Sequence, residues 1–438
     1  MADVDAMRAL AQPLVTPADL DPLLERIGDA HYVLLGEASH GTAEYYSWRA
    51  EITRRLVAEQ GFSFVAVEGA WPDCYRVNRC VKHGGEVPAD PREVLDGYER
   101  WPTWMWANEE VVDFARWLRE HNAGRSYGEM VGFYGLDVYS LWDSIRALTD
   151  YLQAHDPEHV EAARAALRCF EPYREDPQGY AWATHASPCS CQEAAATLTQ
   201  RLSADGQRPD GQRPDGEDPE ARFAAEQNAA VVAGAERYYR TMVEGRAESW
   251  NVRDRHMTDT LDRLMARHGE AARAVVWEHN THLGDARYTD MAAGGMVNVG
   301  QLVRERHGER DVVIVGFGGH RGRVIAARSW GAQMQRMPVP PAREGSIEAR
   351  LHSAGLDSAL FVFPPRDQQP AWLREELDHR AIGVVYAPHR ERRGNYVPTV
   401  LGSRYDAFLY VGVTDALHPL HLEPEAASGE AQTYPSAV

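Results

Sequence analysis

The sequence predicts an α/β protein with a central, largely parallel sheet flanked by helices and an inserted helical cap. Short apolar segments rich in β-branched residues recur along the chain, each bounded by turn residues. These segments are continuously apolar rather than alternating, which is typical of strands that helices cover on both faces. Helical periodicity separates several of them, and an alternation of strands and helices favours a parallel sheet.

The strand pattern recurs from the first part of the chain to its last part. In chain order, the predicted strands are residues 32–36, 64–68, 131–136, 274–277, 312–317, 359–363, 382–386 and 407–411. Ligands of open α/β sheets bind at the carboxyl ends of the strands. The residues that directly follow each segment are therefore the first candidates for chemistry.

A helix is predicted over residues 44–59, between the first two strands. Its apolar stripe repeats at spacings of three and four and consists of Tyr45, Trp48, Ile52 and Leu56. Thr42 is a candidate N-cap, and Gly61 is a candidate stop signal. This helix would cover one face of the sheet.

From about residue 102 to residue 269 the pattern is almost entirely helical, and it predicts a cap inserted into one domain that spans residues 1–422. The predicted helices of this stretch are 108–121, 141–154, 157–170, 191–203, 220–244 and 251–267. Residues 205–219 contain the pentapeptide GQRPD twice, and such a polar segment rich in Pro and Gly predicts a mobile loop. The tail 423–438 is predicted to be disordered.

The charge balance excludes two classes of partner. Lys and Arg number 46 against 65 Asp and Glu, which gives a formal net charge of −19. Such a charge repels phosphate backbones and anionic membrane surfaces. We therefore expect no nucleic acid and no membrane as partner, and a small molecule as ligand. The composition does not indicate an oligomeric state.

Cysteine usage and the absence of apolar runs predict a soluble protein of the cytoplasm. No run of 18 apolar residues is present, and the first residues lack the basic and apolar regions of a signal peptide. The cysteines are odd in number and lack CxxC spacing, so we expect a reducing compartment and buried thiols rather than disulfides. They are Cys74, Cys80, Cys169, Cys189 and Cys191.

Ionisable side chains follow three of the predicted strands. Glu37 and His40 lie in the turn after the first strand, Glu68 ends the second, and His279 and His282 follow the fourth. The carboxyl ends of parallel strands share one rim, so these side chains should converge. An imidazole can take a proton from water near neutral pH, and a carboxylate beside it can fix its tautomer. The combination predicts a catalytic cluster.

Taken singly, each motif has other interpretations. Glu37 and His40 could serve only to hydrogen-bond the start of the helix at 44–59, and Glu68 could serve only to pair with Arg49 or Arg54 of that helix. Glu37, Glu68, His40 and His279 could also supply ligands to a divalent metal ion. His320 ends a glycine-rich segment that lacks the P-loop pattern, and it is either a pocket residue or part of a tight turn.

Together these motifs resemble the erythromycin esterase family. The resemblance rests on G-E-x-x-H at Gly36–His40, on an Arg nine residues further on, on a second strand that ends in Glu, and on H-N-x-H at His279–His282. Further matching segments are GLDVY with Asp137, WNVRDRHM with Arg253 and Asp254, and a GxxGH turn that ends in His320. The similarity runs from about Leu20 to Pro419.

The resemblance implies a hydrolase with an α/β core and a helical lid that cleaves an ester, in particular a macrolide lactone. It implies that His40 is the general base that activates water, without a covalent intermediate, and that Glu37 and Glu68 orient it. His279 and His282 would bind or protonate the substrate. The remaining expected site residues are Arg49, which would hold the carboxylates or polarise the carbonyl, and the substrate-binding positions Glu44, Asp137, Arg253 and His320.

The resemblance implies that no metal and no other cofactor takes part, and a role in antibiotic resistance. Two other functions stay open on the residues alone. One is a metal-dependent hydrolase of another ester, amide or phosphoester bond. The other is a small-molecule binding protein without catalytic activity.

Overall fold

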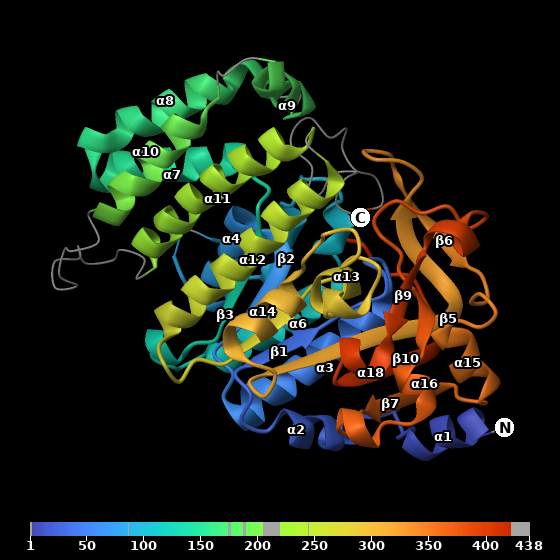
Figure 1. The fold of residues 1–438 in the computed structure, drawn as a ribbon. Helices are drawn as coiled ribbons and strands as arrows, with labels where there is room; N and C mark the ends of the chain where they lie inside the picture. The colour runs from blue at the N-terminus through green and yellow to red at the C-terminus, as the bar shows by residue number, and fades with distance from the viewer. Residues whose placement is uncertain are drawn as a thin grey trace.

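An eight-stranded sheet lies at the centre of the computed structural model, which describes residues 2–85, 87–173, 177–186, 190–204, 220–243 and 245–421 (Figure 1). The strand order is β3-β2-β4-β1-β5-β10-β7, and β6 pairs with β5. The strands are β1 (Tyr32–Leu35), β2 (Phe64–Ala70), β3 (Gly132–Asp137), β4 (Ala274–Trp277), β5 (Val312–Ala327), β6 (Met334–Val339), β7 (Ser358–Val362) and β10 (Ala407–Thr414). The six strands from β3 to β10 in this order pair in parallel, and only β6 and β7 join antiparallel. The predicted fold class is confirmed.

Helices cover both faces of this sheet because alternate strand residues point to opposite layers. Val33 and Leu35 of β1 pack into one core, and Tyr32 and Leu34 pack into another. The first layer contains α2 (Asp21–Ile27), α3 (Ala43–Gln60), α4 (Trp71–Val81), α5 (Pro91–Asp96) and α6 (Glu109–Asn122). The second contains α1 (Ala2–Leu10), α12 (Arg246–His268), α14 (Val299–His307), α15 (Ile347–Ser353) and α16 (Ala371–Arg374).

A third hydrophobic core belongs to the helices between β3 and α12, which stack beyond one end of the sheet (Figure 1). They are α7 (Leu141–His155), α8 (Val160–Phe170), α9 (Pro177–Ala186), α10 (Gln192–Ala204) and α11 (Ala221–Thr241). Helix α6, which the sequence pattern groups with the cap, packs instead into the first core beside the sheet. The predicted mobile loop 205–219 and the predicted disordered tail lie outside the described residues.

The helix predicted at 44–59 is confirmed as α3. It ends at Gly61, whose φ of 68° places it in the left-handed region that favours glycine. Thr42 occupies the N-cap position, but its side chain does not cap the helix. Three short helices of four residues each are α13 (Asn280–Leu283), α17 (Glu391–Gly394) and α18 (Leu401–Arg404).

One strand prediction is wrong, and so is the interpretation of residues 316–320 as a turn. Residues 382–386 form no strand. Ile382 and Val385 make only isolated bridges, to Ser39 and Ala327, and Ile382 and Tyr386 pack in a small hydrophobic cluster of their own. The glycine-rich segment that ends in His320 is not a turn, because β5 continues through it to Ala327 and pairs with β10 and then with β6. Glycines there let neighbouring elements approach the strand closely.

A second, two-stranded sheet is absent from the sequence prediction, as is β6. It pairs β8 (Glu376–Arg380) with β9 (Tyr396–Val400) in antiparallel register. Charged residues in β8 and a proline in β9 hide the strand pattern, because these half-exposed strands do not need continuous apolar side chains.

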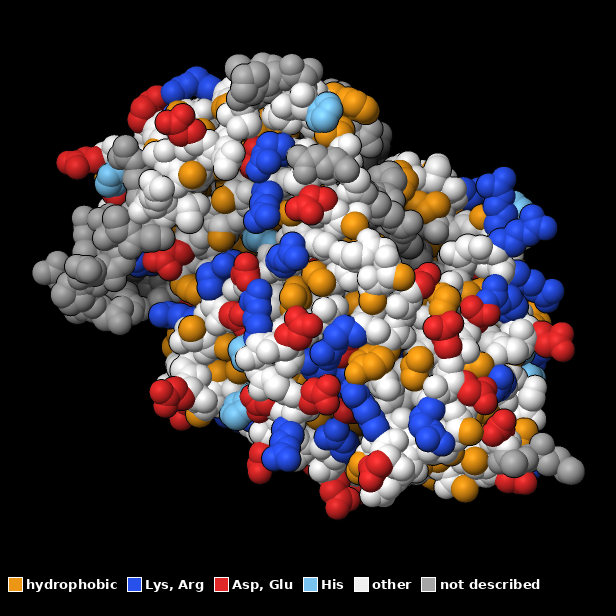
Figure 2. All heavy atoms as spheres, viewed as in Figure 1, with side chains coloured by type: hydrophobic (Ala, Val, Ile, Leu, Met, Phe, Trp, Pro, Cys, Tyr) orange, Lys and Arg blue, Asp and Glu red, His pale blue; other side chains and the backbone are white. Residues whose placement is uncertain are grey.

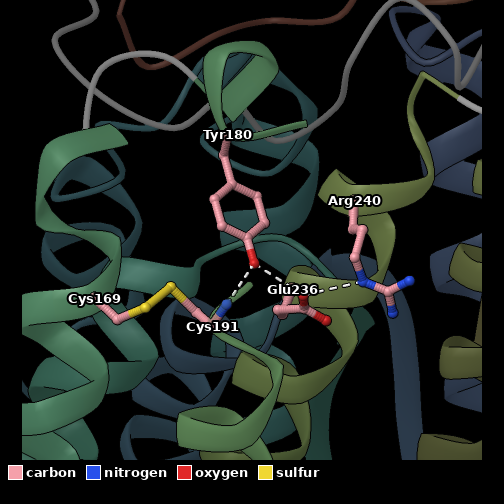
Figure 3. The surroundings of a disulfide bond; sticks show 5 residues. All are labelled: Cys169, Tyr180, Cys191, Glu236 and Arg240. Atoms are coloured by element: carbon pink, nitrogen blue, oxygen red, sulfur yellow. Dashed lines mark hydrogen bonds and ion pairs between the residues drawn. A yellow bond between two sulfur atoms is a disulfide. The ribbon is translucent and has the colours of Figure 1, made fainter. Parts of the chain in front are cut away.

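The prediction of unpaired cysteines is wrong for one pair. Cys169 and Cys191 form a disulfide, with a Cα–Cα distance of 5.9 Å. Figure 3 shows this bond next to Tyr180, whose hydroxyl accepts a hydrogen bond from the Cys191 N–H and donates one to Glu236. The two cysteines are 22 residues apart, and only the packing of α8 beside α10 brings them together. Cys74 and Cys80 are buried and free, as expected, and Cys189 lies outside the described residues.

Surface charge and helix length are the two features that relate to binding of nucleic acid or a membrane. Basic and acidic side chains are interspersed on the face drawn in Figure 2. Among the described residues, no helix is long and apolar enough to cross a membrane. The cytoplasmic location stays a prediction.

Candidate active site

The ends of β1, β2 and β4 lie side by side and bring the predicted site residues to one rim of the sheet. Trp277 at the end of β4 pairs with Leu35 of β1 on one side and with Val67 of β2 on the other. The residues that follow these positions include Glu37, Glu68 and His279. All three side chains are buried.

His40 is oriented by Glu37. The His40 Nδ1 lies 2.9 Å from Glu37 Oε1, and the other Glu37 oxygen forms an ion pair of 2.8 Å with Arg49 of α3. A carboxylate oxygen accepts, so this contact places the imidazole proton on Nδ1 and leaves Nε2 free as a base. Arg49 is fully buried between the rings of Tyr46 and Trp277, at 4.2 and 5.2 Å from their centroids.

Glu68 is held by an arginine of α12, a helix of the second layer. Arg253 of α12 donates to Glu68 Oε1 at 2.8 Å and to both oxygens of Asp137 at 2.9 and 2.6 Å. The second Glu68 oxygen accepts the backbone N–H of His279 at 2.9 Å. Burial by itself raises the pKa of Glu68, but neighbouring His282 and Arg253 outweigh it and hold that pKa below its usual range.

His279 lies beside His40, with ring centroids 4.9 Å apart. Its Nδ1 accepts the backbone N–H of Thr281 at 3.3 Å, and an N–H can only donate. Burial and the neighbouring His40 lower the pKa of His279 well below its usual value. The neutral ring therefore carries its proton on Nε2. Within the described part of the chain this buried atom makes no hydrogen bond of standard geometry, although a hydrogen bond with the Ala38 backbone acts to raise the pKa of His279.

Both ring nitrogens of His282 are occupied by the protein. Nδ1 lies 2.9 Å from Asp254 Oδ1, and Nε2 lies 3.0 Å from Arg253 Nη1. Trp250 stacks on the ring at a centroid distance of 4.5 Å. The sequence analysis did not single out Trp250. It precedes Arg253 by one turn of the same helix, and this spacing is the signal that could have found it.

Glu278 is a further carboxyl group that the sequence analysis did not assign. It is fully buried, and neither of its oxygens has a hydrogen-bond partner among the described residues. Burial, and then the nearby carboxylates of Glu68 and Asp254, raise the pKa of Glu278 well above its usual value. The protein therefore favours the protonated form of this carboxyl group more than water does.

Two predicted substrate-binding residues have their contacts outside the cluster. Glu44 accepts the backbone N–H of Asp415, and burial raises the pKa of Glu44. His320 stacks on His352 at 3.9 Å, and burial together with that ring lowers the pKa of His320 to about 4. Within the described residues, no hydrogen bond, ion pair or ring contact links either side chain to His40.

The carboxylates at the rim are engaged by arginines rather than grouped for a metal ion. Arg49 pairs with Glu37, and Arg253 pairs with Glu68. In the ranges that the structure describes, no group of three or more His, Cys, Asp or Glu side chains has the arrangement of a metal site. The two imidazoles of this cluster, His40 and His279, lie side by side.

Comparison with known proteins yields relatives over most of the chain. A sequence model of the family described as erythromycin esterase matches residues 57–414, which include Glu68 and His279 but not His40. A protein of Escherichia coli described as erythromycin esterase type II is 21% identical over 387 residues, covering 80% of this chain and 85% of that protein.

Solved structures share the fold. A protein described as a succinoglycan biosynthesis protein superposes with a TM-score of 0.73 at 20% identity, covering 95% of this chain and 97% of its own. An erythromycin esterase mutant in its open conformation superposes with a TM-score of 0.66 at 17% identity, covering 92% and 95%. At these identities the likeness concerns the fold.

Proposed function

The chain belongs to the erythromycin esterase family, and from this membership and the site geometry we propose that it hydrolyses an ester by means of water activated by His40. The observation that carries the proposal is the pair of imidazoles at the rim. One is arranged as a base and the other as a hydrogen-bond donor, and their ring centroids are 4.9 Å apart. Ester hydrolysis needs both groups in one place.

His40 acts as the general base. With its Nδ1 proton held by Glu37, the Nε2 atom takes a proton from a water molecule, and the resulting hydroxide attacks the ester carbonyl carbon. Glu37 stabilises the imidazolium that forms, and Arg49 keeps that carboxylate in place. The imidazolium then returns the proton to the leaving alkoxide oxygen. Because water and not a side chain attacks the carbonyl carbon, no covalent enzyme intermediate forms.

His279 stabilises the charge that develops on the carbonyl oxygen. Its Nε2–H is buried and makes no hydrogen bond of standard geometry among the described residues, so donation to the oxyanion requires little reorganisation. Glu68 fixes the backbone of His279, while Arg253 and Asp137 fix Glu68. In this mechanism Arg253, Asp137 and His282 position the catalytic groups and do not contact the substrate.

We propose that the substrate is a macrolide lactone and that the protein has a role in macrolide resistance. The support is the family and the relative from Escherichia coli that carries the name erythromycin esterase type II. A lactone is an internal ester, so its hydrolysis adds one water and opens the ring without releasing a fragment. The reaction is therefore visible as a change in mass alone.

The test is mass spectrometry of macrolides of several ring sizes, and of simple esters, after incubation with purified protein. We expect a gain of one water on a macrolide, abolished in His40→Ala and retained in His155→Ala, an exposed histidine of α7. Loss of a base of this kind lowers kcat by about 100-fold or more. No hydrolysis of any ester by folded protein would contradict the function.

The same assay separates the metal-free mechanism from the metal-dependent alternative. We expect a chelator to leave the rate of hydrolysis unchanged, because arginines occupy the two carboxylates that a metal ion would need. Loss of turnover on chelation, with recovery on addition of a divalent ion, would overturn the metal-free mechanism.

A further inference from the structure

Asn280, the residue between His279 and Thr281, links the turn after β4 to the end of β1 and to an inner position of β5. Its backbone N–H donates to the carbonyl of Glu37 at 2.8 Å, and its side-chain Nδ2 donates to the carbonyl of Phe317 at 2.7 Å. Its Oδ1 packs so closely over β1 that a Cβ on Gly36 would lie 2.1 Å from it. Asn280 thus joins the end of β1, which carries Glu37, to the turn that carries His279.

The second proton of the Asn280 amide points to a residue of the small second sheet. His379 of β8 places its Nε2 3.1 Å from Asn280 Nδ2 and its Nδ1 2.6 Å from Glu348 Oε1 of α15. All three side chains are at most 1% exposed. The carboxylate accepts from Nδ1, so Nε2 has a lone pair for the amide proton. Burial lowers the pKa of His379, although Glu348 opposes this, and a neutral ring is what the contact requires.

We propose that Glu348, His379 and Asn280 form a positioning chain that holds the base His40 and the donor His279 in register with each other. The chain starts on α15, passes through the second sheet and ends in the catalytic turn. Asn280 acts on His279 through the peptide that they share, and on His40 through the carbonyl of Glu37. This inference rests on the proposed hydrolase function, in which both imidazoles must reach one carbonyl group.

The geometry of the chain makes a specific demand on position 379. The contact to Glu348 needs a donor near the place of Nδ1, and the contact to Asn280 needs an acceptor at the place of Nε2. A glutamine side chain reaches as far as Nε2 and can offer its amide oxygen there, so it keeps the contact to Asn280 and loses the one to Glu348. An asparagine side chain reaches only as far as Nδ1, so it keeps the contact to Glu348 and loses the one to Asn280.

The experiment therefore compares His379→Gln with His379→Asn, two amides that differ by one methylene group. We expect kcat to fall by about tenfold or more in His379→Asn, because displacement of catalytic groups by a fraction of an ångström is costly, with KM nearly unchanged. His379→Gln keeps the contact to Asn280, so it should lower kcat much less than His379→Asn does. Tyr180→Phe serves as control, since it removes buried hydrogen bonds in the helical region without touching the chain.

Equal kcat values in the two folded variants would overturn the positioning chain, as would a fall in Tyr180→Phe of the same size as in His379→Asn. A second readout does not depend on turnover: the ring nitrogen NMR signals of His40 and His279 should shift in His379→Asn and stay in place in His379→Gln. If the wild type hydrolyses no ester, the proposed function fails. The NMR comparison then still decides whether position 379 controls the catalytic turn.

Discussion

At the scale of single residues, Glu278 is a buried acid whose pKa the fold raises. Its raised pKa means that the folded state binds more protons than the unfolded state above the ordinary pKa of a glutamate. The free energy of unfolding therefore falls as pH rises through this range, with a slope of at most about 1.4 kcal/mol per pH unit from this group.

Glu278→Gln should remove this contribution. We expect the variant to gain stability relative to the wild type as pH rises from about 5 to about 8, measured by denaturant unfolding at several pH values. The exposed Glu25→Gln is the control, and its difference from the wild type should not change with pH. If the difference in stability between Glu278→Gln and the wild type does not change with pH, the pKa of Glu278 is the same in the folded and unfolded states.

Burial also determines how much Arg253 contributes to the free energy of unfolding. It is the arginine that lies between two buried carboxylates, so its removal leaves Glu68 and Asp137 without their cation. We expect Arg253→Met to lower the free energy of unfolding by about 3–5 kcal/mol, measured by chemical denaturation.

The matched control for Arg253 is Arg116→Met, which breaks a two-bond pair with Asp90 at the protein surface. Its cost should be within about 1 kcal/mol, because solvent screens exposed ion pairs. Equal effects of the two substitutions would show that the buried network adds nothing beyond an ordinary surface pair.

At the scale of elements, the turn after β1 and the turn after β4 are packed against each other through a glycine. A Cβ at Gly36 would meet the Asn280 side chain at 2.1 Å, and that side chain is itself held by Phe317 and His379. We expect Gly36→Ala to lower both stability, by about 1–3 kcal/mol, and kcat. Thermal unfolding and steady-state kinetics on the best ester measure the two effects.

Gly128→Ala is the control for this element, because nothing lies within 4 Å of a Cβ built at that exposed position. It should change neither quantity measurably. An unchanged kcat in Gly36→Ala would show that the two turns move independently.

At the scale of the whole molecule, the disulfide belongs to the core of the helical region and not to the sheet. Cys191 packs in the third hydrophobic core, and the bond closes a loop with a sequence separation of 22. Loop-closure entropy suggests a contribution of about 3 kcal/mol to the stability of this region. We expect the double variant Cys169→Ser, Cys191→Ser to unfold at lower denaturant concentration than the oxidised protein.

A reductant distinguishes the disulfide from the side effects of substitution. It should lower the unfolding midpoint of the wild type and leave that of the double variant unchanged. If the reductant has no effect on the wild type, the cysteines are not paired in solution.

Local pattern was enough for the sheet strands that are covered on both faces. Continuous apolar segments such as Val312–Phe317 have one arrangement that buries both sides, so strands β1 to β5, β7 and β10 follow from the sequence. The half-exposed strands β6, β8 and β9 were missed because burial on one side leaves no such pattern. His379, a member of the positioning chain, lies in one of them.

The sequence by itself determined the α/β class and the meeting of Glu37, Glu68 and His279 at one rim, because parallel strands bring their carboxyl ends to one edge. Only the tertiary structure decided which partner each group has. It assigned Arg49 to Glu37, Arg253 to Glu68 and Asp137, and His352 to His320. Hydrogen bonds and ion pairs act over a few ångströms, and sequence spacing does not specify positions to that accuracy for residues on different elements.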